Sequence, residues 1–251
     1  MPAWLSKLFF GIVVFITNII QTITGFAGTV LAMPFSISLV GYNFAKPILN
    51  IVALAVCVIV VILHFKQIEW KAIILMLVPM AIGMVGGYFL KKYLFKYNHT
   101  FLIIYGSIVC LIAILYLFQR KDVVLPEWVN ILIMLFAGIV HFIFVSGGPL
   151  LIIVAKNKIK EKDSFRATLS MIWVLLNSAI LTTDLVQHSM SLDSVWMLLI
   201  LLPTVIASVA VGRIVVKKMS NNIFMKLTCV LLFISGAFLV TTNAIGIIRA
   251  R

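Results

Sequence analysis

Two pairs of small residues that interrupt long apolar stretches are the features of this sequence that could take part in chemistry. Ala27-Gly28 interrupts residues 17–34, and Gly147-Gly148 interrupts residues 137–154. The two stretches lie 120 positions apart in a chain of 251 residues. Broken apolar segments at matching positions of two halves are typical of the site where a membrane transporter binds its substrate.

Each break would expose the first backbone N–H groups of a new helix. A helix N-terminus carries about half a positive charge and several free donors. Two such termini that meet would therefore bind an anion. We predict that Gly25, Gly28, Gly147 and Gly148 form this substrate site. The alternative is that these glycines only allow close helix packing.

Polar side chains inside a membrane are costly, so they are candidates for function. Gln21 and His141 occupy equivalent positions before the two breaks, and Thr29 and Ser146 lie close to them in the sequence. We predict that these four side chains contact the substrate. Four further polar residues are candidates for substrate contacts or for hydrogen bonds between helices: Asn18, Asn50, Ser170 and Asn177.

Three charged residues have two interpretations each. Lys46 and Arg166 also lie 120 positions apart, at the starts of the apolar runs that follow the breaks. They would either attract an anion or anchor their helices at the membrane surface. Asp184 is the one carboxylate within an apolar run. It would either couple transport to protons or lie at a helix end near the surface.

The composition indicates the class of protein. Hydrophobic residues make up 63% of the chain and charged residues only 11%, whereas a soluble domain is about half apolar and a quarter charged. Apolar runs of about 18–22 residues recur, and each is long enough to cross a bilayer. We predict an all-α polytopic protein of a cell membrane, the bacterial inner or plasma membrane, in contact with the lipid bilayer.

The net charge of +13 does not indicate nucleic-acid binding. The basic residues fall in short gaps between apolar runs, such as Lys91-Lys92 and residues 156–162. This is the pattern of loops that stay in the cytoplasm. We therefore expect the loop at 156–166 in the cytoplasm and both termini on the outside.

A basic, turn-prone gap at 119–128 divides the chain into two repeat halves, 1–120 and 121–251. Each half is predicted to have one glycine-broken segment and three full transmembrane helices. A helix rises about 1.5 Å per residue, so residues 5–41 are too long for one straight span, which favours a re-entrant hairpin. Hairpins would make the halves inverted repeats, which we prefer, and single broken spans would make them parallel. The predicted apolar segments are 5–24, 28–41, 45–64, 72–90, 100–118, 129–145, 148–155, 165–186, 195–215 and 223–247.

The sequence predicts neither an enzyme nor a metal site. Cys57, Cys110 and Cys229 are scattered in apolar runs, which is not a metal-ligand or disulfide pattern. Ser146 is not flanked by glycines as in the G-x-S-x-G motif of a nucleophile elbow. We expect no cofactor and no catalytic residue.

Five short motifs, in their order and spacing, resemble a known family. They are GFAGTVLAMP (25–34), FKQIEWK (65–71), IGMVGG (82–87), SGGPLLII (146–153) and RATLS (166–170). The chain is similar along nearly its whole length to the TauE/SafE-type sulfite exporters, which are bacterial anion permeases. The resemblance implies a substrate such as sulfite, a sulfonate, or another organosulfur or carboxylate anion.

The sequence as a whole predicts a secondary permease for a small anion. The anion would sit between the two broken helices, and the halves would rock around it to give alternating access. The alternative is an integral membrane protein without transport activity, such as a scaffold, an assembly factor or a sensor subunit. The sequence leaves open the exact substrate, the direction of transport, the coupling ion and whether the protein forms a homo-oligomer.

Overall fold

The computed structural model describes residues 2–96, 98–118, 125–187 and 190–249, which are almost entirely helical. The helices are α1 (Ala3–Thr24), α2 (Ala27–Val40), α3 (Tyr42–His64), α4 (Trp70–Lys96), α5 (Asn98–Phe118), α6 (Glu127–Phe144), α7 (Gly148–Lys158), α8 (Lys162–Val186), α9 (Leu192–Lys217) and α10 (Asn221–Arg249), with a short 3₁₀ turn, η1 (Phe65–Gln67), after α3. These described residues contain no β-strand. The prediction of an all-α protein is confirmed.

The outer surface of the bundle is apolar. Within the described ranges, seven helices are long and apolar enough to cross a membrane. Large hydrophobic side chains point outward along them, including Ile62, Ile74, Ile82, Trp196 and Ile206. A surface of this kind is stable in lipid, where helices also satisfy their own backbone hydrogen bonds. The prediction of a polytopic membrane protein is confirmed.

The chain reverses direction at the first break (residues 25–26). Gly25 ends α1 in the left-handed conformation, with φ 83°, and its N–H donates to the Gln21 carbonyl. Glycine adopts this conformation without the steric cost that a side chain would bring. The chain then returns along α1, because the ring of Phe44, just beyond α2, lies 6.2 Å from the ring of Phe10.

The second break (residues 145–147) also reverses the chain. Val145 ends α6 in the same left-handed conformation, with φ 52°, and its N–H donates to the His141 carbonyl. Pro149 lies in the first turn of α7, where its missing N–H costs no hydrogen bond. The ammonium of Lys158 at the end of α7 lies 2.8 Å from the Glu127 carboxylate at the start of α6. Both breaks are therefore hairpins.

The arms of the hairpins differ from the expected lengths. A re-entrant hairpin at residues 5–41 would have two short arms, but α1 has 22 residues and is about 33 Å long. The second hairpin likewise begins with the 18-residue α6. Only the returning helices are short, with 14 residues in α2 and 11 in α7. The first arms are long because each apolar run continues without interruption to its left-handed cap.

The two halves of the chain interlock. Helix α4 packs against α6, α5 against α10, and α3 against α8. Gly106 and Gly236 let α5 and α10 approach closely, since a Cβ on either residue would lie 2.7 Å from the carbonyl oxygen of the other. Small residues at such crossings are typical of helix packing in membranes. The predicted division after residue 120 lies outside the described residues.

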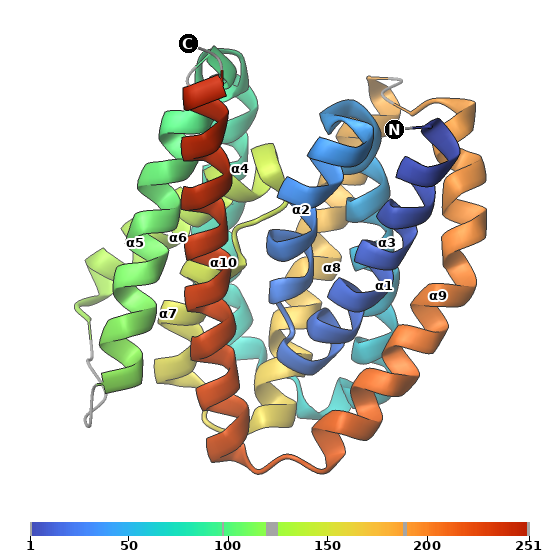
Figure 1. Ribbon diagram of the computed structural model, residues 1–251. Coiled ribbons are helices and arrows are strands. Elements are labelled where there is room, and N and C mark those ends of the chain that lie inside the picture. Colours follow the sequence, from blue (N-terminus) through green and yellow to red (C-terminus); the bar gives the residue numbers. More distant parts are fainter. Residues whose placement is uncertain (1, 97, 119–124, 188–189, 250–251) are drawn as a thin grey trace.

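Both described chain ends lie at one end of the bundle, and the α7–α8 and α9–α10 connections lie at the other (Figure 1). We call the first the terminal face and the second the basic face, because the latter carries the lysines of residues 156–162. The α2–α3 connection belongs to the terminal face, since the Lys7 ammonium lies 5.7 Å from the Phe44 ring centroid.

We expect a cysteine at Asn43 to be labelled from outside the cell by a membrane-impermeant thiol reagent. Asn43 is exposed on the terminal face, and the basic face is expected in the cytoplasm. Labelling of intact cells, compared with permeabilised cells, measures this orientation. Labelling that occurs only after permeabilisation would contradict it.

Candidate functional site

The two breaks contact each other inside the bundle. A Cβ on Gly148 would lie only 3.1 Å from the Cβ of Phe26 in the first break. A cavity between them, which we call the central cavity, is lined by Gln21, Phe26, Thr29, Ala53, His141, Val145, Gly148, Trp173 and Asn177. Its volume of about 10 Å³ has room for about one water molecule. The breaks meet as their matched positions predict, around a space for about one water molecule.

Side-chain oxygens of Gln21 and Thr24 accept hydrogen bonds from the backbone donors of the first break. Its Oε1 accepts a hydrogen bond of 2.9 Å from the Gly28 N–H, while the Thr24 hydroxyl oxygen accepts from the N–H groups of Phe26 and Ala27. The Gln21 Nε2 donates only long bonds, 3.4 Å to the Gly25 carbonyl and 3.6 Å to the Cys57 sulfur. Bonds of this length are weak. The N–H groups that the sequence assigns to an anion are thus held by the protein's own side chains here.

His141 lies at the second break, enclosed by α8. Its Nε2 lies 3.0 Å from the Asn177 Oδ1, and its ring centroid lies 4.8 Å from that of Trp173. The Asn177 oxygen can only accept, so Nε2 carries the proton and Nδ1 presents a lone pair. Nδ1 is buried and has no hydrogen-bond partner in the described part of the chain. A buried polar atom left in this way costs free energy.

The same close contact occurs at both breaks. A Cβ on Gly28 would lie 2.6 Å from the Gln21 Cβ and 2.7 Å from the Thr17 carbonyl oxygen. A Cβ on Gly147 would lie 2.8 Å from the His141 Cβ and 2.6 Å from the Ala137 carbonyl oxygen. Gln21 and Thr17 are each 120 positions before His141 and Ala137. The counterpart of Gly28 in this contact is therefore Gly147, not Gly148.

Side-chain pairs around the central cavity repeat with the same offset. Gln21 contacts Cys57, and His141 contacts Asn177, 120 positions further on in both cases. Asn50 donates to the Asn177 carbonyl at 3.1 Å, and its counterpart Ser170 interacts with the Cys57 thiol. Residue numbers rise along α3 as they fall along α8, so these two helices cross the centre antiparallel.

Lys46 and Arg166 have different partners. The Lys46 ammonium lies 2.9 Å from the Asp184 carboxylate, and the two side chains are only 4% and 7% exposed. Arg166 donates 3.1 Å to Asp163 and 2.9 Å to the Thr22 carbonyl. The predicted attracting lysine and coupling carboxylate thus neutralise each other, which favours a structural role for the pair.

A family comparison identifies the chain. Residues 10–239 match the sulfite exporter TauE/SafE family. The chain belongs to this family. Neither a curated protein nor a solved structure matches it. The TauE/SafE proteins are transporters, so the chain is a multi-pass transport protein of the cell membrane, as the motifs indicate.

Of the other residues predicted to contact the substrate of this TauE/SafE protein, one lines the central cavity and two do not. Thr29 lines the central cavity with Gln21, His141 and Gly148. Ser146 does not line it, because its hydroxyl donates to the Phe144 carbonyl and its own carbonyl accepts from Tyr105. The Asn18 side chain donates a 2.6 Å hydrogen bond to the Val14 carbonyl one turn earlier in α1, so its amide N–H is used within its own helix.

Sequence reasoning missed Trp173 and the role of Cys57. The Trp173 indole N–H donates 2.7 Å to the Gly25 carbonyl and so fixes the first break from α8. A tryptophan buried in an apolar run needs such an acceptor, which is the signal that would have singled it out. Cys57 would have been found by applying the offset of 120 to Asn177.

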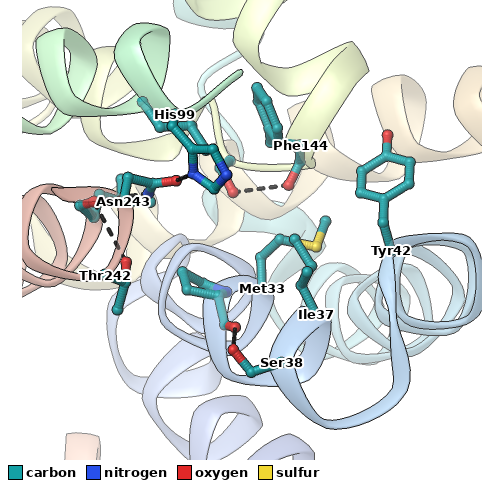
Figure 2. Close-up of a pocket in the computed structure, with 12 residues that line it drawn as sticks. Met33, Ile37, Ser38, Tyr42, His99, Phe144, Thr242 and Asn243 are labelled. Carbon is teal, nitrogen blue, oxygen red and sulfur yellow. Dashed lines mark hydrogen bonds between the residues drawn. The ribbon is translucent and has the colours of Figure 1, made fainter. Parts of the chain in front are cut away.

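A larger pocket joins the second break of this TauE/SafE protein to the terminal face. Figure 2 shows Met33 and Ile37 of α2 facing His99 of α5 and Asn243 of α10 across it. Ser146 also lines it, and its volume is about 150 Å³. His99 and Asn243 are joined by a 2.9 Å hydrogen bond. The pocket provides space for a solute beside the second break.

Proposed function

We propose that this TauE/SafE protein is a secondary permease that binds a small anion between the two breaks. The observation that carries the proposal is the central cavity, where two chain reversals bring Gln21 and His141 together. Irregular backbone at this depth is tolerated where it lines a cavity or is buried in protein. A cavity with room for about one water is smaller than a sulfite ion with its contacts, so the cavity must widen when an anion binds.

The anion would bind by exchange with Gln21. The long bonds from its Nε2 are weak, so rotation of the amide mainly costs the 2.9 Å bond that Oε1 accepts from the Gly28 N–H, and the anion replaces that acceptor. Rotation frees the Gly28 N–H at the start of α2, where the helix dipole favours negative charge. The Gln21 Nε2 then donates to the same anion. The Gln21 side chain would thereby cover the Gly28 N–H before the anion binds and contact the anion afterwards.

His141 would supply the proton that accompanies the anion. Its unpartnered Nδ1 is the position at which a proton binds, and a doubly protonated ring donates from both nitrogens. A proton there offsets the charge of an anion in a medium that disfavours net charge. Anion and proton would therefore bind together, and a proton gradient or the membrane potential would drive transport.

Alternating access would arise if the two halves of the chain exchanged their conformations. The repeated contacts at an offset of 120 and the antiparallel crossing of α3 and α8 support inverted repeats. The pocket of about 150 Å³ reaches the second break from the terminal face. If the halves exchanged conformations, the equivalent pocket would open beside the first break from the basic face.

A flux assay in liposomes tests the proposal. Purified protein is reconstituted, and uptake of sulfite, thiosulfate, sulfoacetate, taurine and simple carboxylates is followed with and without an imposed pH gradient. We expect saturable flux of at least one anion, with sulfite the first candidate because of the family. Folded protein that moves none of these anions under either condition would overturn the proposal and favour a scaffold or sensor.

Gln21→Glu should weaken substrate binding by at least about tenfold. A second negative charge within about 4 Å of the anion costs this much or more at an effective dielectric constant of 20. The substrate concentration at half-maximal flux measures the effect. Gln187→Glu is the matched control, because Gln187 is exposed at the end of α8, and it should leave that concentration unchanged. Equal concentrations for both variants would place the site elsewhere.

A further inference from the structure

The basic face holds a second pocket, separate from the central cavity. We call it the basic pocket, and it is lined by His64, Asp163, Arg166, Ala210, Arg213, Ile214, Val216 and Lys217. It lies between the end of α3, the start of α8 and the last turns of α9. Its volume of about 390 Å³ is large enough for an oxyanion with several water molecules.

Arg166 forms the buried wall of the basic pocket. The residue is only 1% exposed, although a guanidinium has five N–H donors. Its Nη1 donates to Asp163 and its Nε to the Thr22 carbonyl, whereas its Nη2 has no hydrogen-bond partner among the described residues. A charged donor left in this way is costly to bury. The planar fork of a guanidinium matches the oxygens of a phosphate, sulfite or sulfonate group.

Arg213 and Lys217 add two further positive charges at the mouth of the pocket. They lie four positions apart and so project from the same side of α9, and both are exposed. The Arg213 guanidinium repels that of Arg166. Among the described residues, Asp163 is the one carboxylate that lines the pocket, and Glu161 also attracts the Arg166 guanidinium. Three permanent cations therefore lie near two carboxylates. An added anion between the two guanidinium groups would relieve their repulsion.

We propose that the basic pocket is a second anion site, which binds the oxyanion group of a soluble anion or of a lipid headgroup. It goes beyond the proposed function, because it lies outside the central cavity and does not require transport. The site also adjoins the first break, since a Cβ on Gly25 would lie 3.5 Å from the Arg166 Cα. An anion bound to Arg166 therefore contacts the residue that packs directly against the first break.

Cysteine labelling of full-length protein tests the site. A cysteine replaces Ala210, which is exposed and lines the pocket, in a Cys110→Ser background that leaves only the buried Cys57 and Cys229. Two methanethiosulfonate reagents are compared, one carrying a sulfonate and one a quaternary ammonium. We expect the sulfonate reagent to react several-fold faster, and sulfate to slow it several-fold relative to chloride at equal ionic strength. Asn221→Cys, exposed on the same face, is the control that sulfate should not protect.

The double variant Arg213→Gln with Lys217→Gln tests whether the charges of the pocket cause the reagent preference and the protection by sulfate. Both side chains are exposed, so the fold should be retained, and both the reagent preference and the protection by sulfate should disappear. Unchanged reagent preference and unchanged protection in this variant would overturn the proposal.

The source of the oxyanion is separated by lipid composition. The labelling is repeated in vesicles of phosphatidylcholine alone and in vesicles that also contain phosphatidylglycerol. Protection by sulfate in phosphatidylcholine alone assigns a soluble anion, and protection by phosphatidylglycerol without sulfate assigns a lipid phosphate. If neither sulfate nor phosphatidylglycerol protects the cysteine, the basic pocket is not an anion site. These results do not depend on flux, so they stand if the proposed transport function fails.

Discussion

Gly28→Ala should abolish anion flux and lower thermal stability. The added Cβ would lie 2.6 Å from the Gln21 Cβ and 2.7 Å from the Thr17 carbonyl oxygen, closer than such atoms can approach. Backbone on one side leaves nothing that can rotate away, so α2 must move off α1. Overpacking of this kind costs about 1–3 kcal/mol. The same shift breaks the hydrogen bond from the Gly28 N–H to the Gln21 side chain. That side chain lines the central cavity.

Gly11→Ala is the matched control on the same hairpin. A Cβ at Gly11 would meet only the ends of Leu201 and Met197 at 3.8 Å, which is an ordinary contact. Alanine also favours a helix by about 1 kcal/mol over glycine, so stability should stay the same or rise. The melting temperature and liposome flux of the two variants measure the difference. Similar behaviour of both would show that the contact at Gly28 is not required.

In the second hairpin, the loss of flux caused by an alanine substitution should likewise depend on how close the added Cβ lies to backbone atoms. Gly147→Ala meets the Ala137 carbonyl oxygen at 2.6 Å, which requires the backbone to move. Gly148→Ala meets the Cβ, the ring and the carbonyl oxygen of Phe26 at 3.1 Å, contacts that a shift of a few tenths of an ångström relieves. We expect Gly147→Ala to lose flux as Gly28→Ala does and Gly148→Ala to be milder. A more severe loss from Gly148→Ala would contradict the equivalence of Gly28 and Gly147.

The helical segments could be predicted from the sequence because bilayer thickness dictates the length of apolar runs. The run predicted at 28–41 is the helix at 27–40, and that at 148–155 continues to Lys158. Helices extend past the apolar run where lysines follow, since lysine is a good helix former and its charge is favourable at a helix C-terminus. The breaks were predictable because Gly28 and Gly148 lie 120 positions apart, at matching places in the two halves.

The details of the second break could not be predicted. Val145 has the left-handed conformation that Gly25 has in the first break. A β-branched residue gives no signal for that conformation, because its side chain disfavours it. The contact of Gly147 in place of Gly148 depends on where the returning backbone meets α6, which an offset in sequence does not specify. Both features are set by the packing of α7 between α6 and the first break.

The buried ion pair could not be predicted from its separate members. Lys46 and Asp184 are 138 positions apart, and each alone matches a residue at a helix end near the membrane surface. Only the antiparallel crossing of α3 and α8 brings them together. The sequence therefore suggested attraction of an anion for Lys46 and proton coupling for Asp184, two roles that a mutual salt bridge disfavours.

Lys46→Ala should lower the free energy of unfolding by about 3–5 kcal/mol, because it leaves the Asp184 carboxylate buried without a partner. The cost falls on Asp184 in particular, since its Oδ2 already has no hydrogen-bond partner among the described residues. Lys7→Ala is the matched control. It removes an ion pair of similar length, 2.8 Å to Asp193, whose side chains are 39% and 67% exposed, and exposed pairs contribute only about 0–1 kcal/mol.

The double variant Lys46→Met with Asp184→Leu distinguishes the two roles of the pair. Replacing both charges with apolar side chains of similar size should recover most of the stability lost in Lys46→Ala, because no buried charge remains. Denaturant unfolding measures the recovery, and liposome flux measures function in the same preparation. A structural pair predicts a stable double variant that transports near the parent rate and retains its response to a pH gradient. A stable double variant without flux would instead indicate that Lys46 attracts the anion. A double variant that transports the anion without responding to a pH gradient would indicate that Asp184, not His141, is the site of proton coupling.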